Sequence, residues 1–214
     1  MRKFLSYFFP ITEKIKTDKN GIVELTWYNG RKMLNSKNAN YSYDSLQRIL
    51  KYGLKQIDLT TVNSVLLLGL GGGSVIATLR KEFSFEKNIV AVDIDQVVID
   101  IAANEFQVVP GANLEIIRVD AYDFIVDCTK QFDLVIIDLF IDTIVPQKFH
   151  SLEFWNSLSK TISPKGYFIF NAALSKNKGI FLSDLIRFWE RNFNFKIYDQ
   201  FVEVNTLVIG QKIA

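Results

Sequence analysis

Glycines and acids in the middle of the sequence have the types and spacing of a nucleotide-binding site. The apolar run 65–68 leads directly into Gly69, Leu70, Gly71, Gly72 and Gly73. Glycine adopts backbone conformations closed to other residues and lets a ligand approach the main chain closely. The next apolar run ends about twenty residues later in Asp93, whose carboxylate suits ribose hydroxyls. Taken by itself, such a glycine loop could be only a structural tight turn. The loop and Asp93 together predict an adenosine-containing ligand.

Two further acids follow the next two apolar runs. Asp120 comes shortly after the run near 114–118, and Asp138 ends the run near 133–138. Open α/β sheets bind ligands beyond the carboxyl ends of their strands, so we expect Asp93, Asp120 and Asp138 to converge on the glycine loop. There Asp120 can accept a hydrogen bond from an adenine amino group, while Asp138 faces the reacting end of the ligand. For each acid taken alone, the alternative is a helix N-cap.

Strands and helices that alternate along the chain must position these residues. We expect strands near 64–68, 89–93, 114–118, 133–138 and 166–171, and helices near 73–83, 95–107, 121–127 and 151–161. A helix near 179–192 leads to strands near 195–201 and 204–210, which must be antiparallel because a parallel return needs a crossover of about a dozen residues. The pattern predicts a three-layer, doubly wound, seven-stranded α/β sheet, mostly parallel with a reversed last strand.

A smaller unit precedes this sheet. The alternating run 22–28, the turn pair Asn29-Gly30 and the return through 32–34 predict a β-hairpin, and apolar residues at helical spacing then predict a leading helix. We therefore expect residues 1–58 to form an N-terminal segment with the hairpin and this helix, and residues 59–214 to form the doubly wound domain. The aromatic run 4–11 is expected to pack on the body of the protein or on a partner subunit.

Composition excludes several classes of function. Lys and Arg (25) nearly balance Asp and Glu (23), so we expect no strongly basic face and no nucleic-acid partner. Cys128 and His150 are the only residues of their types, which rules out an internal disulfide and a multi-cysteine or His-rich metal site. No apolar run approaches the roughly 20 residues of a spanning helix. We expect a cytoplasmic protein without metal or membrane partners.

The order and spacing of the motifs resemble the spermidine synthase-like family over about residues 21–171. Besides the glycine loop, the segments that carry the resemblance are Ser42-Tyr43-Asp44, Val92-Asp93-Ile94-Asp95, Val119-Asp120-Ala121, the run from Phe132 to Asp138, and Leu152-Glu153-Phe154. That family has the class I S-adenosylmethionine-dependent methyltransferase fold with an N-terminal β-hairpin unit, usually forms dimers, and transfers an aminopropyl group from decarboxylated S-adenosylmethionine to a polyamine. The resemblance implies a transferase of this kind.

The resemblance also implies roles for individual residues. S-adenosylmethionine or its decarboxylated form would be held by Gly69, Leu70, Gly71, Gly72, Gly73, Asp93, Ile94, Asp120 and Ala121. Asp138 would orient the acceptor amine and take its proton, assisted by Tyr43 and Asp142. The alternatives are simple packing for Tyr43 and a solvated loop acid for Asp142.

Departures from the family's pattern concern the acceptor side. Gly72 stands where the polyamine synthases have an aspartate, Ala39-Asn40 replace an acidic pair, and the second acid after Asp138 comes one residue late, as Asp142. Fewer carboxylates attract a polycation less, because charge-assisted hydrogen bonds are the strong ones. We therefore expect methyl transfer to a small amine slightly ahead of aminopropyl transfer. The alternatives are a non-catalytic nucleoside-binding or scaffold relative and an NAD-dependent dehydrogenase, which Ser74 at the third fingerprint position disfavours.

Overall fold

The computed structural model describes the chain except residues 37–39, 43–44, 143, 173–184, 202–204 and 214. Its centre is a seven-stranded sheet with the order β10-β11-β9-β8-β5-β6-β7. The strands are β5 (Ser64–Leu68), β6 (Asn88–Asp93), β7 (Leu114–Arg118), β8 (Phe132–Ile137), β9 (Ile162–Ala172), β10 (Phe193–Phe201) and β11 (Asn205–Lys212). β11 runs antiparallel to both of its neighbours and the other pairs are parallel, which confirms the predicted fold class.

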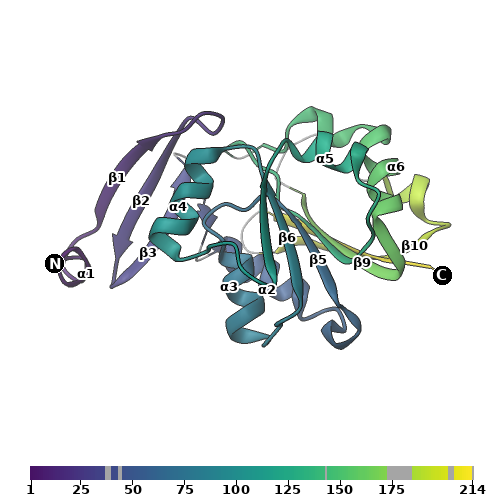
Figure 1. Ribbon diagram of the computed structural model, residues 1–214, viewed down its shortest axis with the longest axis horizontal. Coiled ribbons are helices and arrows are strands. Elements are labelled where there is room, and N and C mark those ends of the chain that lie inside the picture. Colours follow the sequence, from purple (N-terminus) through teal and green to yellow (C-terminus); the bar gives the residue numbers. More distant parts are fainter. Residues whose placement is uncertain (37–39, 43–44, 143, 173–184, 202–204, 214) are drawn as a thin grey trace.

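Helices cover both faces of this sheet (Figure 1). α2 (Ser45–Leu54) and α3 (Ser74–Glu82) lie on one face, and α5 (Ala121–Asp127) and α6 (Leu152–Thr161) pack together on the other. In β5, Val65 and Leu67 belong to the first core and Leu66 and Leu68 to the second. All four side chains are fully buried, which explains why this strand is an unbroken apolar run.

Strand β9 begins earlier than the sequence predicted. α6 ends at Thr161 and the chain passes directly into β9 at Ile162, which pairs with Phe132. Lys165 has a positive φ of 63°, and the register with β8 shifts in this region. The turn-like residues before Tyr167 therefore form a bulge within the strand instead of ending it. Of the helix predicted near 179–192, residues 185–189 are helical, and 173–184 lie outside the described residues.

The predicted hairpin is part of a larger antiparallel sheet. Its strands are β1 (Ile11–Lys16), β2 (Ile22–Tyr28), β3 (Arg31–Ser36) and β4 (Asn40–Ser42), in that order. Asn29 and Gly30 have φ values of 47° and 73°, as a type I′ turn requires. The prediction missed β1 because this edge strand is mostly polar and exposed, with no alternating apolar face to identify it.

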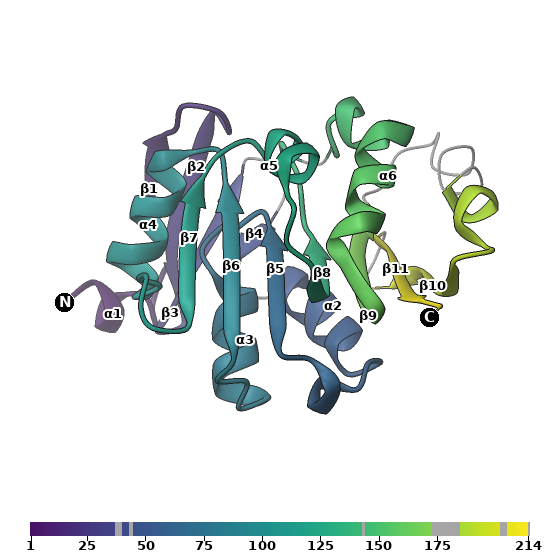
Figure 2. The same ribbon diagram turned by 45° about the vertical axis from the view of Figure 1, so that its right-hand side comes forward.

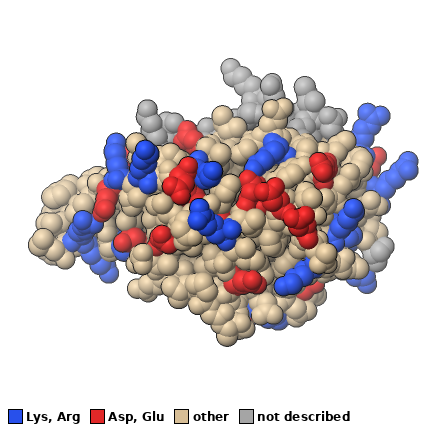
Figure 3. All heavy atoms as spheres, turned by 45° about the horizontal axis from the view of Figure 1, so that its top comes forward, with Lys and Arg blue, Asp and Glu red and all other residues tan. Residues whose placement is uncertain are grey.

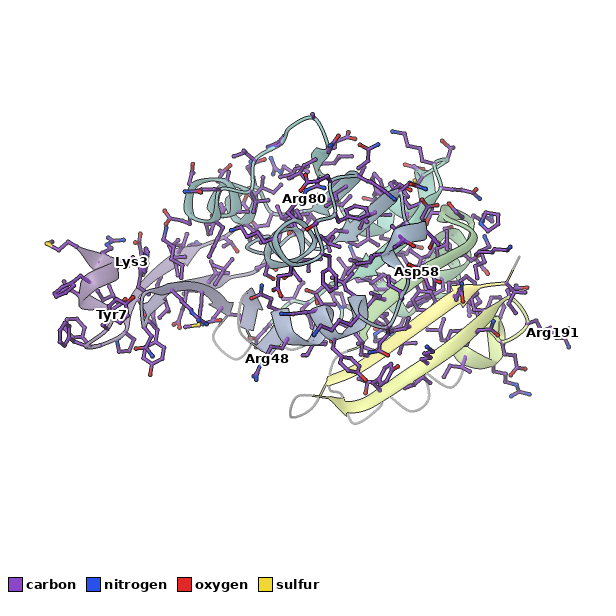
Figure 4. The ribbon with its side chains drawn as sticks, turned by 90° about the horizontal axis from the view of Figure 1, so that it is seen from below. Lys3, Tyr7, Arg48, Asp58, Arg80 and Arg191 are labelled. Carbon is purple, nitrogen blue, oxygen red and sulfur yellow. The ribbon has the colours of Figure 1, made fainter. Side chains whose placement is uncertain are left out.

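The aromatic N-terminal run contacts the hairpin of the N-terminal sheet, where the Asn29 and Gly30 N–H groups donate to the carbonyl and hydroxyl oxygens of the buried Ser6 at 2.9 and 3.0 Å. It forms the short helix α1 (Arg2–Leu5) and the turn after it, with Phe4, Tyr7 and Phe8 all more than half exposed. Figure 4 shows Lys3 and Tyr7 at the far end of the N-terminal sheet, away from the seven-stranded sheet. The run therefore packs on the rest of the chain through the N-terminal sheet, and packing on a partner subunit stays a prediction.

The N-terminal sheet lies against α4 (Gln96–Phe106), which separates it from β6 and β7 (Figure 2). Val23 and Leu34 of that sheet pack on Ile101 of α4. α2 instead packs on the seven-stranded sheet, where Leu54 shares a core with Ile169. The division of the chain at residue 58 stays a prediction. In the described part of the chain, no helix has both the length and the apolar character needed to cross a bilayer.

Asp95 fastens the N-terminal sheet to the main body. Its carboxylate caps α4 by accepting from the Val97 N–H at 3.1 Å. Its other oxygen accepts from the Lys19 N–H at 2.8 Å and from the backbone and side-chain nitrogens of Asn20 at 3.2 and 3.1 Å. Burial by itself raises the pKa of Asp95, but hydrogen bonds from Lys19, Thr17 and Asn20 outweigh burial and hold the pKa below its ordinary value.

We expect Asp95→Ala to lower the free energy of unfolding by about 2–4 kcal/mol at pH 7, because it removes a helix cap and charge-assisted hydrogen bonds. The folded-state pKa is lowered, so the carboxylate stabilises the protein above the unfolded-state pKa of 3.8 and loses this effect as the pH falls through the folded-state value. Urea denaturation from pH 7 down to pH 3 should show the difference between variant and wild type shrinking with acidification.

Asp100→Ala serves as the matched control. Asp100 is an exposed acid of the same helix and its carboxylate accepts from the Gln96 side chain. Its removal should change stability by no more than about 0.5 kcal/mol. Equal effects of the two substitutions would contradict the role given to Asp95.

Candidate functional site

The residues predicted to bind the cofactor, together with Asp138, lie at the carboxyl ends of the parallel strands, the upper edge of β6 and β7 in Figure 2. The register places the last residues of β5 and β8 level with the next-to-last residue of β6. The residues that come next in the three strands are Gly69, Asp93 and Asp138. Backbone hydrogen bonds extend the ladder there, from the Gly69 N–H to Val92 O and from the Asp138 N–H to Leu68 O, both at 2.9 Å.

The glycine loop needs glycine at particular positions. Gly69 has a φ of 93°, and a Cβ there would lie 2.2 Å from the Asp138 carbonyl oxygen. Gly73 has a φ of 77°, stands at the N-cap of α3, and would place a Cβ 2.5 Å from a methyl group of Val108. Gly71 also has a positive φ, 52°. The loop is therefore a tight turn that glycine forms without strain and whose backbone lies close to its neighbours, as the sequence predicted.

Asp93 holds this loop in place. One carboxylate oxygen accepts from the Leu70 and Gly71 N–H groups at 3.0 and 3.4 Å, and the other accepts from the Asp95 N–H at 3.0 Å. Burial raises the pKa of Asp93, and these hydrogen bonds oppose the rise. A carboxylate offers about four acceptor positions, so three N–H donors leave room for a ribose hydroxyl. Ile94, the next residue, is half-buried.

Asp120 is a helix N-cap, the alternative that the sequence left open, and its role in binding adenine stays a prediction. One oxygen caps α5 by accepting from the Tyr122 N–H at 2.9 Å, and Ala121, the first helical residue, is buried. The other oxygen pairs with Nζ of Lys148, from the single-turn helix η2 (Gln147–His150). A bond from the Val119 N–H to Asp93 O at 3.0 Å ties the ends of β6 and β7 together.

Asp138 has the electrostatic surroundings of a proton acceptor. Burial raises the pKa of its carboxyl to about 7, and a hydrogen bond from the Asn171 amide, 3.0 Å from Nδ2 to Oδ1, acts in the opposite direction. Asn171 is fully buried in β9, one position beyond Phe170, which pairs with Ile137 of β8. A pKa near neutrality is suited to a general base, which must be deprotonated and still bind a proton.

The two residues expected to assist Asp138 have different outcomes. Tyr43 lies outside the described residues. Asp142 is partly buried, has a φ of 55°, and accepts a 2.5 Å hydrogen bond from the Ser36 hydroxyl at the end of β3. It therefore links the N-terminal sheet to the loop after β8, and the alternative of a freely solvated acid does not hold. Its part in catalysis stays a prediction.

Two residues of this edge escaped the sequence analysis. Asn171 is a polar residue at the end of an apolar run, and this contrast is a signal that could have identified it. Lys148 carries no such signal, because it lies in a polar segment 28 residues from Asp120. The packing of α5 against α6, and of α6 against η2, brings the two together.

Comparison with known proteins identifies related sequences and solved structures with a similar fold. A probable polyamine aminopropyl transferase of Bifidobacterium longum is 28% identical over 109 residues, which are 51% of this chain and 24% of the relative. A polyamine aminopropyltransferase of Chromobacterium violaceum is 32% identical over 108 residues, 50% of this chain and 41% of the relative. The chain thus matches less than half the length of either relative.

The human methyltransferase-like protein 13, solved in complex with SAH, superposes with a TM-score of 0.67 at 19% identity, covering 80% of this chain and 83% of that one. At this identity the likeness shows a shared methyltransferase-like fold. The family model described as the spermine/spermidine synthase domain matches residues 46–209. Because this match takes in most of the 214 residues, the chain belongs to the spermine/spermidine synthase domain family.

Proposed function

We propose that this protein transfers an alkyl group from an adenosyl sulfonium, S-adenosylmethionine or its decarboxylated form, to a small amine. The observation that carries the proposal is Asp138, whose carboxyl has a pKa raised to about 7 and lies level with the glycine loop. Family membership supports the class of cofactor, as does the methyltransferase-like fold of a protein solved with SAH.

In the proposed complex the residues at the carboxyl edge hold the nucleoside. The glycine loop, including Leu70, lies close to the ligand. Asp93 and the neighbouring Ile94 bind the ribose, and Asp120 with Ala121 binds the adenine amino group. Acceptor groups fit this task because ribose hydroxyls and the adenine amino group are hydrogen-bond donors. Alignment of nucleophile and target carbon in such a site can contribute roughly 7–11 kcal/mol.

The protein has one proton to handle in this reaction. The sulfonium supplies a good leaving group: the amine nitrogen forms a bond to carbon while the carbon–sulfur bond breaks and its electron pair stays on sulfur. Asp138 orients the amine and accepts the proton that the nitrogen loses. Asn171 donates to Asp138 and favours the carboxylate form that can do so. Tyr43 and Asp142 are proposed to assist on the acceptor side.

Aminopropyl transfer to a polyamine-like acceptor is the first candidate for the reaction. Both relatives described above are named aminopropyltransferases, which weighs more than the departures that led us to expect methyl transfer. Methyl transfer is the second candidate, because Gly72 removes a negative charge and makes the carboxylate of S-adenosylmethionine easier to admit. A homodimer stays a prediction from the resemblance, and a cytoplasmic location stays a prediction from the composition and apolar runs of the sequence.

Acidic and basic side chains are interspersed on the face shown in Figure 3. With a formal net charge of +2, this pattern gives no support to a polyanionic partner.

A calorimetric titration tests the proposal directly. The ligands are S-adenosylmethionine, decarboxylated S-adenosylmethionine, 5′-methylthioadenosine and NAD, and each form of the sulfonium is then assayed with a panel of amines. Binding of the adenosyl ligands together with product formation supports the proposal. Binding without product would favour the non-catalytic relative, binding of NAD alone would favour a dehydrogenase, and binding of none would favour a scaffold protein.

We expect Asp138→Asn to lower kcat about 100-fold or more, because an amide cannot accept the amine's proton. The dissociation constant for 5′-methylthioadenosine should change less than about threefold, since that nucleoside lacks the acceptor amine. In the wild type, kcat should rise with pH through about 7 as Asp138 deprotonates. Asn171→Leu should move this rise in kcat to higher pH, because it removes the hydrogen bond that lowers the pKa of Asp138.

Asp127→Asn, an exposed acid at the end of α5, is the control for the activity measurements and should leave kcat unchanged. Undiminished turnover by Asp138→Asn would refute the assignment of the base.

Asp138→Asn should also stabilise the folded protein at alkaline pH. A folded-state pKa of about 7 against 3.8 in the unfolded chain means that the folded state holds the proton more tightly, so stability falls as the pH rises from 4 through 7. The shift corresponds to about 4 kcal/mol, and partial exposure of the residue reduces the expected gain for Asp138→Asn to about 1–3 kcal/mol at pH 8.

Urea denaturation at pH 8 and pH 4 measures this difference. The gain in stability should be present at pH 8 and nearly absent at pH 4, where the wild-type carboxyl is protonated in the folded state. Identical stability of variant and wild type at pH 8 would show that the carboxyl is not desolvated.

A further inference from the structure

The ammonium group of Lys148 forms an ion pair with Asp120, the acid that we assign to the adenine. Nζ of Lys148 pairs with Oδ2 of Asp120, whose side chain is 16% exposed, while the lysine side chain is 44% exposed. The other oxygen of Asp120 is already engaged by the Tyr122 N–H. Each carboxylate oxygen can accept about two hydrogen bonds, so a ligand that binds Asp120 shares an oxygen either with the Tyr122 N–H or with the lysine, and in both cases it lies close to Nζ of Lys148.

The backbone that presents Lys148 is firmly anchored. The indole nitrogen of Trp155, a fully buried residue of α6, donates to the carbonyl oxygen of Phe149 at 2.8 Å. Phe149 is itself buried, and Nζ of Lys148 lies 5.0 Å from the centre of its ring. The bond from Trp155 fixes η2 to α6, which packs on α5. The lysine head group can adjust while its attachment stays in place.

Asp120 and Lys148 together match the hydrogen-bonding groups of adenine better than Asp120 does alone. The six-membered ring of adenine presents an amino donor at N6 beside an acceptor at N1. A carboxylate can satisfy only the donor, whereas an ammonium has three N–H groups, of which one reaches Asp120 and two are left. Asp120 can accept from N6 while Lys148 donates to N1. A solvent-exposed ion pair contributes only about 0–1 kcal/mol to folding, so stability gives little reason for the pair.

We propose that Lys148 is a base-reading residue that donates a hydrogen bond to N1 of the adenine, with Asp120 accepting from N6. This inference rests on the proposed function, because it takes the adenosyl ligand and the role of Asp120 from there. It adds a specificity-determining contact from η2, an element that no sequence motif marks.

A thermodynamic cycle between protein and ligand isolates this contact. Calorimetry measures the dissociation constants of 5′-methylthioadenosine and of its 1-deaza analogue, in which carbon replaces N1, for the wild type, Lys148→Met and Lys148→Arg. We expect Lys148→Met to weaken binding of 5′-methylthioadenosine about tenfold, the size of a charged hydrogen bond. Binding of the 1-deaza analogue should change less than about twofold. Lys148→Arg keeps a donor and should retain most of the affinity for 5′-methylthioadenosine.

Lys51→Met is the matched control. It removes the cation of the Lys51–Glu82 pair, which joins α2 to the end of α3 remote from the glycine loop, and it should leave both constants unchanged. Thermal denaturation of each variant verifies that it is folded.

Each other outcome overturns the inference in a recognisable way. An equal loss of affinity for both nucleosides would mean that Lys148 acts on something other than N1. Tighter binding by Lys148→Met would mean that the lysine competes with the base for Asp120. If the wild type binds neither nucleoside, the proposed function fails and the inference fails with it; if the wild type binds both and Lys148→Met behaves like the wild type, only the inference fails.

Discussion

The buried carboxylate of Asp93 organises the carboxyl edge of the sheet. A buried charge is costly unless it is hydrogen-bonded, and here backbone N–H groups from Leu70, Gly71 and Asp95 supply the bonds. Those donors can reach Asp93 only if the chain turns sharply after β5, which requires the positive φ of Gly69 and its close approach to Asp138. One electrostatic requirement thus sets the shape of the loop and brings Asp93 and the backbone of Asp138 against it.

A second acid extends this arrangement to the N-terminal sheet. Asp93 and Asp95 are two residues apart, and while the first binds the glycine loop the second binds the β1–β2 turn at Lys19 and Asn20. The contact between Ser36 and Asp142 adds a tie from β3 to the loop after β8. These polar links bring one end of the N-terminal sheet to the edge that carries the proposed site.

The parts that local sequence could predict are those with a strong local cause. The unbroken apolar run of β5, buried on both faces, and the few residues between β10 and β11 left little freedom in strand type or direction. β1 could not be predicted, since an exposed polar edge strand has no apolar periodicity. The bulge in β9 could not be predicted, because Pro164-Lys165-Gly166 has the composition of a turn and only the pairing with β8 shows that the strand continues through it.

In the candidate site, too, some residues could be predicted from local sequence and others could not. Acids placed at strand ends, such as Asp93 and Asp138, could be found from spacing alone. Lys148 could not, because its meeting with Asp120 depends on how α6 packs on α5. The raised pKa of Asp138 likewise comes from tertiary burial and from Asn171 on a neighbouring strand, neither of which a motif records.

The central claim is that the glycine loop and the acids at the strand ends bind one nucleoside together. A crystal structure of the protein grown with 5′-methylthioadenosine tests it most directly. The account predicts density for the ribose within hydrogen-bonding distance of Asp93 and for the adenine beside Asp120, with the thioether directed toward Asp138. Density for the nucleoside elsewhere on the protein, with the glycine loop and all three acids unbound, would contradict it.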